Sequence, residues 1–424
     1  MNSRINFVTK FFLQSSTVFI GSAAGNFLLI VSLPFITSIY TTSSFGFHAL
    51  FYSGLAALSA LITSRLEMAV VISKKNEVFP IFILSLGSIA LYLILTTCLF
   101  YFFNSSELLD KETLNNINEL KFIILFGIAF LGLQVVLESF LNREQNYSLL
   151  SISRFLTPVC FLFISFFPVD IGYTTKNLII AQSFAPVLSI SIIILSIKNT
   201  LVISTTNLFS RLKNVFIKYK KFPAISAPTA FLDNLAASSP IFLIGILYSE
   251  ELVALYALAL RLGYGPLSMI SRSVSQVTLR TISSLYNENK DVFSHLLKLM
   301  TPFSFLFIPI LLFVYFAENI IELFFDDEWL MTGKILKILV PIFFYKFFVS
   351  CFSTSLEAMD RVIAASLWKL LAILTIPLGI YISSFFLNET ELFISLSIIE
   401  FILYSIYLFL ILYFAAKANS QGNY

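Results

Sequence analysis

The sequence predicts an all-α polytopic membrane protein with about twelve transmembrane helices. Two features of the composition indicate this fold class. Hydrophobic residues make up 58% of the 424 residues and charged residues only 12%, about half the charged share of a soluble protein. The mean hydropathy is +0.89. Because one spanning helix needs about 20 apolar residues, about twelve spans nearly use up this apolar content.

Apolar runs separated by short polar breaks place these helices in order along the chain. The first run, 11–35, follows the basic residues Arg4 and Lys10. It is longer than the roughly 7–15 apolar residues of a signal peptide, so we expect an uncleaved first helix, in which Gly21 and Gly25 are spaced for close helix packing. The other predicted spans are 46–72, 79–103, 121–141, 147–168, 177–197, 224–247, 252–279, 296–316, 335–357, 363–386 and 392–415.

The positions of Lys and Arg orient the predicted spans. With the N-terminus in the cytoplasm, 16 of the 27 Lys and Arg residues fall at cytoplasmic ends of spans, five at outer ends and six inside spans. The bias alternates from loop to loop, as the positive-inside rule requires. The sequence therefore predicts that both termini are cytoplasmic.

Two short matches indicate that the halves of the chain are related. Residues 40–50 (YTTSSFGFHAL) and 248–258 (YSEELVALYAL) each lie between the first and second helix of a half. Leu-Glu-Ser at 137–139 and Leu-Glu-Ala at 356–358 each close a fourth helix. Two six-helix lobes with the same orientation follow, as in several transporter folds. The predicted domains are an N-terminal lobe at 1–200, a basic cytoplasmic linker at 201–222 and a C-terminal lobe at 223–424.

Charged side chains inside the spans are the candidate functional residues. A charge near the bilayer centre costs about 2.5–3.5 kcal/mol on insertion scales, so each one needs a polar cavity or a partner. Cations that face a shared cavity would attract an anionic solute such as a diphosphate; an ion pair within the protein is the alternative. The substrate-cavity candidates are Arg65, Arg154, Arg261, Arg272 and Lys369, and the ion-coupling candidates are Asp233 and Glu400.

Several function classes lack their sequence signatures. There is no GxxxxGK[ST] motif for a nucleotide-driven motor and no GxSxG or HExxH motif. Cys98, Cys160 and Cys351 stand alone in apolar runs, so we expect no metal site and no cofactor. The formal net charge of +3 indicates no nucleic-acid partner. We therefore expect a transporter rather than an enzyme.

Three groups of residues resemble bacterial polysaccharide flippases. The first group is Tyr40-Thr-Thr-Ser-Ser-Phe45-Gly46 with Ala49-Leu-Phe, Arg65-Leu66-Glu67 and Lys74-Lys75. The second is Leu255-Tyr256-Ala257-Leu258 with Arg261, Pro266-Leu267-Ser268 and Ser275-Gln276-Val277. The third is Asp327-Glu328-Trp329 with Thr332-Gly333, Ile338-Leu339 and Pro341. On these motifs the chain resembles the Wzx-type O-antigen exporters of the multidrug/oligosaccharidyl-lipid/polysaccharide (MOP) superfamily, over nearly its whole length.

The resemblance implies a MATE-like transporter fold and a flippase function. Such proteins move an undecaprenyl-diphosphate-linked oligosaccharide from the cytoplasmic to the periplasmic leaflet of the bacterial inner membrane by alternating access. An H+ or Na+ gradient is the implied energy source, and a polysaccharide polymerase and a chain-length regulator are the implied protein partners. Two alternatives stay open: a cation-coupled multidrug exporter of the same fold, and a membrane-bound O-antigen polymerase or glycosyltransferase.

Overall fold

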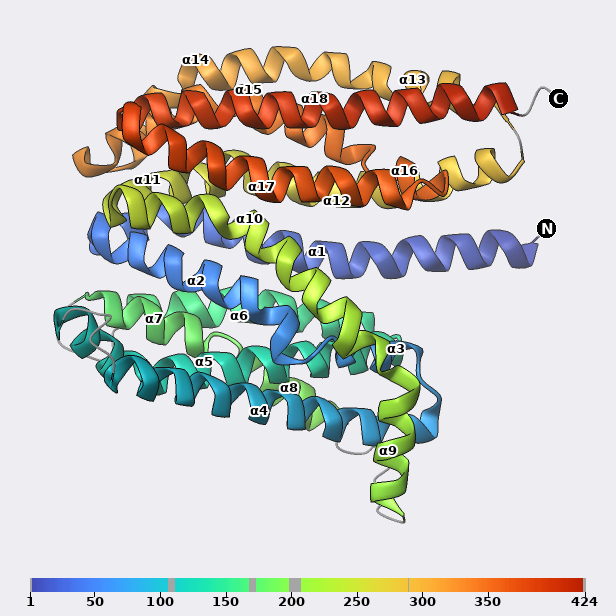
Figure 1. Ribbon diagram of the computed structural model, residues 1–424, viewed down its shortest axis with the longest axis horizontal. Helices are drawn as coiled ribbons and strands as arrows, with labels where there is room; N and C mark the ends of the chain where they lie inside the picture. The colour runs from blue at the N-terminus through green and yellow to red at the C-terminus, as the bar shows by residue number, and fades with distance from the viewer. Residues whose placement is uncertain (1, 106–110, 168–172, 198–206, 289, 422–424) are drawn as a thin grey trace. The chain divides into compact units, whose positions relative to one another are not determined.

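The computed structural model describes residues 2–105, 111–167, 173–197, 207–288 and 290–421, without the side chains of 2–19, 103, 105, 111–117, 304–311 and 419–421. Within these ranges the regular structure is helical and contains no strand (Figure 1). The helices are α1 (Asn2–Ile39), α2 (Thr42–Ile62), α3 (Leu66–Ile72), η1 (Lys75–Glu77), α4 (Val78–Ser105), α5 (Lys111–Arg143), α6 (Tyr147–Phe166), α7 (Thr175–Phe184), α8 (Val187–Ile197), α9 (Leu208–Tyr219), η2 (Phe222–Ser226), α10 (Ala227–Leu247), α11 (Glu250–Ala259), η3 (Leu260–Tyr264), α12 (Gly265–Asn287), α13 (Val292–Met300), η4 (Thr301–Leu306), α14 (Phe307–Phe324), η5 (Asp327–Trp329), α15 (Leu330–Cys351), α16 (Ser355–Ala358), α17 (Val362–Phe386) and α18 (Glu389–Gln421).

The predicted fold class is confirmed: this is an all-α protein with many membrane-spanning helices. Among the described residues, 11 helical stretches are long and apolar enough to cross a bilayer, and each overlaps one predicted span. The remaining prediction, 296–316, falls partly on residues 304–311, whose side chains lie outside the described set. There the chain forms α13, then η4, then α14, which begins at Phe307. Pro302, which lacks a backbone N–H, follows the end of α13 and explains why that helix stops.

The chain divides into two compact units: residues 1–40 with 51–238, and residues 41–50 with 239–424. In unit 1, α5 is the central helix and contacts α3, α4, α6, α7 and α8. Helix α1 packs along α6, where a side chain at Gly21 would overlap Ser151; the close packing expected at this glycine is confirmed. The predicted lobes at 1–200 and 223–424 stay a prediction, because the units are defined by contacts and divide the chain inside α10.

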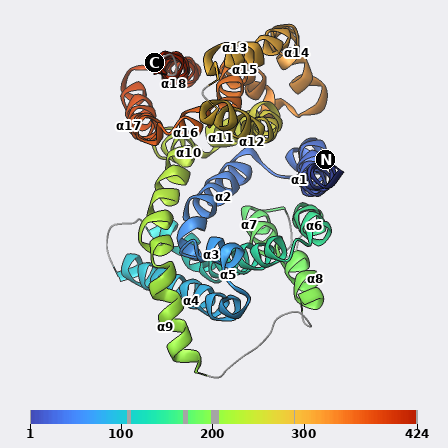
Figure 2. The ribbon, with the colours of Figure 1, turned by 90° about the vertical axis from the view of Figure 1, so that its right-hand side faces the viewer.

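Helix α15 occupies the corresponding central place in unit 2. It contacts α11, α12, α14 and α18, and Figure 2, which looks along many of the helices, shows it among its neighbours. Apolar side chains from α12, α13, α15 and α18 form one core cluster that includes Phe347 and Leu356. Any charged side chain on the inward faces of these helices is therefore buried and needs a partner.

Helices α5 and α16, which contain the two Leu-Glu matches, end in the same way. Gln145 after α5 and Asp360 after α16 both have left-handed backbone conformations, with φ values of 56° and 58°. The next N–H reaches back five residues in each case, from Asn146 to Leu141 (3.0 Å) and from Arg361 to Leu356 (2.8 Å). This is the bond of a Schellman helix end. The local structures at the two Leu-Glu matches are therefore alike.

The first repeated segment also has matching local structure at the offset of 208 residues. Helix α1 ends at Ile39 and α10 at Leu247. The next helices start with equivalent caps: Thr41 Oγ1 accepts the N–H of Ser44 (3.3 Å) and Ser249 Oγ accepts that of Leu252 (3.1 Å). The sequence match between 40–50 and 248–258 thus reflects the same turn between two helices.

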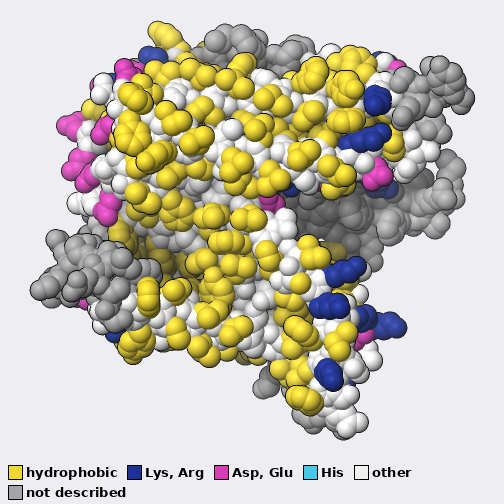
Figure 3. Space-filling view, viewed as in Figure 1, with side chains coloured by type: hydrophobic (Ala, Val, Ile, Leu, Met, Phe, Trp, Pro, Cys, Tyr) yellow, Lys and Arg dark blue, Asp and Glu magenta, His cyan; other side chains and the backbone are white. Residues whose placement is uncertain are grey.

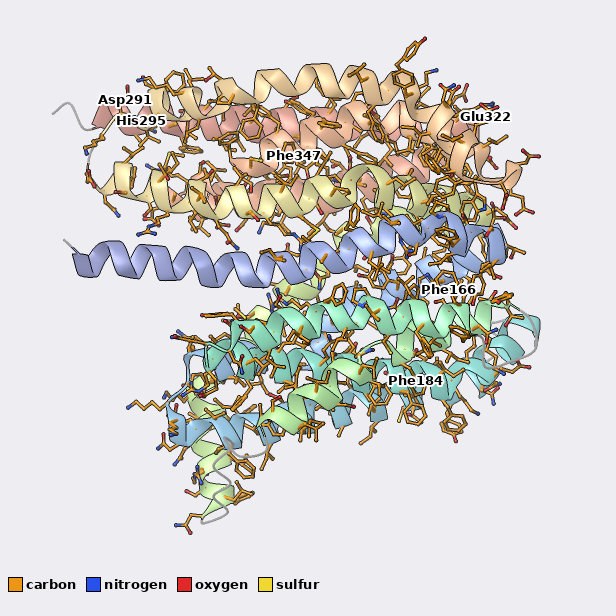
Figure 4. All side chains as sticks on the ribbon, turned by 180° about the vertical axis from the view of Figure 1, so that it is seen from behind. Phe166, Phe184, Asp291, His295, Glu322 and Phe347 are labelled. Carbon is orange, nitrogen blue, oxygen red and sulfur yellow. The ribbon has the colours of Figure 1, made fainter. Side chains whose placement is uncertain are left out.

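Charge is unevenly distributed along unit 2. Asp and Glu side chains gather at the end formed by the starts of α11, η5 and α18 (Figure 3). Figure 4 shows Glu322 towards that end, Phe347 in the interior, and Asp291 with His295 at the opposite end. Within this unit the helices therefore run between an acidic end and an end that carries Lys and Arg.

Candidate functional site

The seven candidates from the sequence divide between the two units. Arg65, Arg154 and Asp233 belong to unit 1, and Arg261, Arg272, Lys369 and Glu400 belong to unit 2. In each unit the structure shows whether a candidate has a charged or aromatic partner and how much of it is exposed.

Arg154 lies in the second turn of α6 and pairs with Glu138 on α5. Its Nε lies 3.3 Å from Glu138 Oε2. Gln134 and Ser153 donate to the other oxygen of Glu138, at 3.0 and 3.2 Å, so the carboxylate is fixed from two helices. The Arg154 side chain is 41% exposed. Because a guanidinium carries five N–H donors, Arg154 can hold Glu138 and still offer donors to an anion.

Arg65 lies at a break in the second predicted span. Ser64 and Arg65 both have positive φ, and they separate α2 from α3. The guanidinium is 3.6 Å from Glu67, which also accepts a hydrogen bond from Thr63 (2.5 Å). Arg65 Nε is buried without a hydrogen-bond partner among the described residues. An interruption between two helices that carries an ion pair is tolerated inside a bilayer only where protein or water surrounds it.

Asp233 is half-buried on α10 in unit 1. The adjacent Asn234 donates to the carbonyl of Ala56 on α2 (3.0 Å). Asp233 therefore lies beside a polar contact that ties α10 to α2.

Arg261 lies in η3, a five-residue π-helical segment between α11 and α12. Its guanidinium lies over the Phe45 ring at 4.9 Å, and Phe45 packs edge-on against the buried Trp329 at 5.3 Å. The cation thus lies over an aromatic face, whose negative quadrupole attracts it. Short π segments in helices are frequent at functional sites.

Glu400 forms a buried ion pair with Lys346. Lys346 Nζ on α15 lies 2.8 Å from Glu400 Oε1 on α18, and their side chains are 20% and 6% exposed. The rings of Tyr264 and Tyr404 lie 4.9 and 5.5 Å from the same Nζ. This cluster of an ammonium, a carboxylate and two aromatic rings joins α15, α18 and η3 inside unit 2.

The last two candidates lie on helix surfaces. Arg272 on α12 and Lys369 on α17 are both exposed within unit 2. They are therefore accessible from outside that unit, whereas Glu400 is not.

Sequence reasoning missed the aromatic partners and Lys346 as a member of the site. Phe45, Tyr264 and Tyr404 belong to segments rich in aromatic residues, so nothing in the local pattern distinguishes them. Lys346 did carry a signal, since it is a lysine in an apolar run and the chain contains a carboxylate at similar depth. Only the packing of α15 on α18 shows that these two are partners.

Comparison with solved structures shows the fold to be that of MOP superfamily transporters. The structure "Lipid II flippase MurJ, inward closed conformation" matches with a TM-score of 0.68 at 17% identity, covering 97% of this chain and 90% of that one. An inward-facing multidrug resistance MATE transporter matches with a TM-score of 0.63 at 14% identity, covering 95% and 96%. A MOP superfamily transporter from Pyrococcus furiosus matches with a TM-score of 0.60 at 15% identity, covering 97% and 96%.

The sequence comparisons identify the family. A search of curated proteins returned no match. A family profile described as "Polysaccharide biosynthesis protein" matches residues 36–333, which is more than half of the chain and includes both 40–50 and 248–258. The chain therefore belongs to the polysaccharide biosynthesis protein family.

Proposed function

We propose that this chain is a flippase that moves an undecaprenyl-diphosphate-linked oligosaccharide, the repeat unit of an O-antigen, from the cytoplasmic to the periplasmic leaflet of the bacterial inner membrane. The observation that carries the proposal is the match of residues 36–333 to the polysaccharide biosynthesis family. The likeness in fold to a protein named as a lipid flippase supports it. Multidrug exporters share the fold, but the family match favours a polysaccharide substrate.

Within unit 1 we assign contact with the diphosphate to Arg154, and within unit 2 to Arg261. A lipid diphosphate carries concentrated negative charge and must leave a hydrated membrane surface, so fixed cations offset part of the cost of its desolvation. Arginine suits this role because its planar fork can hold two phosphate oxygens. Each residue is anchored by a neighbouring group, Arg154 by the Glu138 carboxylate and Arg261 by the Phe45 ring. Arg65, Arg272 and Lys369 are further candidates along the substrate path.

Alternating access driven by an ion gradient is the proposed mechanism. The chain has no nucleotide-binding motif, so H+ or Na+ is the proposed energy source. Asp233 and Glu400 are the proposed ion-coupling candidates. Glu400 has the ammonium of Lys346 as a partner in the structure. A polysaccharide polymerase and a chain-length regulator would use the translocated product.

Complementation of a flippase-null bacterial strain tests this function. We expect the null strain to accumulate unmodified lipid-linked repeat on the cytoplasmic leaflet, and expression of this chain to restore surface polysaccharide. Lectin labelling of intact spheroplasts measures which leaflet carries the repeat. Single repeats that reach the outer surface but are not polymerised in the absence of this chain would instead favour the polymerase. Restored drug resistance without restored polysaccharide would favour the multidrug exporter.

A further inference from the structure

The groups around Lys346 are those expected of a binding site for a small cation. Here the Lys346 ammonium occupies the position of that cation. One carboxylate oxygen and two tyrosine rings surround a single positive nitrogen, at 2.8, 4.9 and 5.5 Å. Carboxylates and aromatic faces are both groups that attract small monovalent cations. The nitrogen belongs to α15, whereas the surrounding groups belong to α18 and η3.

The carboxylate cannot stay ionised at this place without a cation. Glu400 lies 11 residues after the first residue of α18, about 16 Å along the helix axis at 1.5 Å per residue. Its side chain is only 6% exposed. An unpaired charge at such depth is unfavourable, so either a mobile cation or a tethered one must accompany it.

We propose that Lys346 is a tethered cation that takes the position of an exchangeable monovalent cation at Glu400. Its ammonium contacts the same carboxylate that Na+ or K+ would need, and its positive charge repels a second cation from the site. Glu400 therefore loads no ion from solution in the wild-type protein. Removing the ammonium leaves a carboxylate beside two aromatic faces, which is a site for Na+, K+ or an alkylammonium ion. This inference concerns binding and does not depend on which substrate the chain transports.

The substitution Lys346→Ala tests the proposal by chemical rescue. It removes three methylenes and the ammonium, and n-propylammonium supplies the same group from solution. Purified full-length protein in detergent is melted in 100 mM NaCl, KCl, propylammonium chloride or N-methylglucamine chloride, and Tm is followed by circular dichroism. We expect the wild-type Tm to be the same in all four salts. We expect the variant to have a lower Tm than the wild type in N-methylglucamine chloride, and a higher Tm with at least one of the smaller cations than with N-methylglucamine. A cation that binds with a dissociation constant of about 10 mM would favour the folded state about 11-fold at 100 mM.

Two matched variants show whether the carboxylate is responsible. Lys346→Ala combined with Glu400→Gln should lose the response to cations, because the anion is gone. Lys337→Ala is a control on the same helix: Lys337 Nζ pairs with Glu318 at 3.1 Å, but these side chains are 51% and 48% exposed, so water replaces the lost partner and no cation dependence is expected.

Three results would overturn the proposal. One is a saturable increase of the wild-type Tm with Na+ or K+ that is lost in Glu400→Gln. Glu400 would then bind an exchangeable ion in the wild-type protein. Another is a folded Lys346→Ala variant that none of the three small cations stabilises over N-methylglucamine. The third result applies if Lys346→Ala does not accumulate in membranes. The double variant should then accumulate more than either single variant, because it leaves no charge unpaired. An equal or lower amount of the double variant contradicts the tethered cation.

Discussion

Arg154 and Arg261 are anchored differently but present the same chemistry. Arg154 is held by a carboxylate that two further donors fix in place. Arg261 is held by the face of Phe45, which also packs against the buried Trp329. In both cases the anchor limits the rotamers of a long side chain, so less entropy is lost when an anion binds. The guanidinium of Arg154, whose side chain is 41% exposed, keeps N–H donors for a second partner.

We expect Arg154→Ala and Arg261→Ala each to reduce surface polysaccharide by about tenfold or more, because hydrogen bonds to a charged group contribute about 1.5–3 kcal/mol. The Arg→Lys variants should retain part of the activity, since they keep the charge but not the planar fork. Surface polysaccharide is measured together with the amount of protein in the membrane. Lys290→Ala is the control, since Lys290 is exposed and, within the described part of the chain, its ion pair is with the exposed Glu288 (2.6 Å). Normal polysaccharide from both alanine variants at normal protein levels would contradict the assignment.

At the scale of elements, α2 and α11 approach closely through their first turns. A Cβ at Gly46 would overlap the backbone carbonyl of Glu250. Ser43 Oγ donates to the Glu250 side chain in the same place (2.9 Å). The close approach therefore depends on the absence of a side chain at Gly46.

The substitution Gly46→Ala should lower Tm by a few degrees, because forcing extra volume into a packed contact costs about 1–3 kcal/mol. Gly54→Ala, in the same helix, is the matched control: nothing lies within 4 Å of its added Cβ. There alanine should be neutral or stabilising by up to about 1 kcal/mol, because its helix propensity is higher than that of glycine. Equal melting temperatures for the two variants would show that the approach of α2 and α11 tolerates a methyl group.

Helix α9 forms within the predicted basic linker at 201–222 and is anchored to the start of α4. Residues 198–206 lie outside the described set. The Glu77 carboxylate accepts hydrogen bonds from Lys218 Nζ (2.6 Å) and the Tyr219 hydroxyl (2.9 Å). The bond to Glu77 raises the pKa of Lys218 above its ordinary value. The ammonium form is therefore present at neutral pH, and its contribution is lost only as the pH rises through that raised pKa.

The substitution Glu77→Gln should loosen α9 without unfolding unit 1. The neutral amide loses the charge-assisted bond to Lys218, so we expect backbone amides in 208–219 to exchange about threefold faster with solvent deuterium. Hydrogen exchange followed by mass spectrometry measures this. Glu288→Gln is the control, because Glu288 pairs with Lys290 far along the chain, in the other unit. Unchanged exchange in α9 would mean that the apolar contacts of Val215 and Tyr219 and the bond from Arg211 to the Asn76 carbonyl hold the helix without this pair.

At the scale of the whole molecule, the predicted topology has both termini in the cytoplasm. The alternation of Lys and Arg along the sequence supports this orientation. The acidic end of unit 2, with Glu250, Glu322 and Glu389, would then face the periplasm. The end with Asp291 and His295 would face the cytoplasm.

Reporter fusions test this orientation. Alkaline phosphatase should be active when it is fused after residues predicted at the outer side, which are Ser44, Asn115, Asn319 and Asn388. It should be inactive after the predicted cytoplasmic residues Asn76, Asn214 and Asn289, the last of which lies outside the described residues. Green fluorescent protein fusions should give the opposite pattern, since it does not fluoresce when it is exported unfolded. Phosphatase activity at Asn214 would reject the topology, because that residue lies in the basic segment on which the orientation depends.

The sequence by itself determined the fold class and 11 of the predicted spans. The reason is physical: a bilayer requires about 20 apolar residues per helix, and this requirement is local in sequence. It also showed which residues are charged inside spans, because such residues interrupt apolar runs. The local likeness of 40–50 and 248–258 was readable for the same reason, since a helix cap and its turn depend on neighbouring residues.

Only the tertiary structure decided how the buried charges are arranged. Glu138 and Arg154 are 16 residues apart, Lys346 and Glu400 are 54 apart, and Arg261 meets a ring from another helix. Which of these side chains meet depends on the rotation and the vertical register of one helix against the next. Those are fixed by the packing of many apolar side chains rather than by the few residues that titrate. For this reason Lys346 and Glu400 were both recognised in the sequence as charges inside spans, while their pairing emerged only from the packing of α15 on α18.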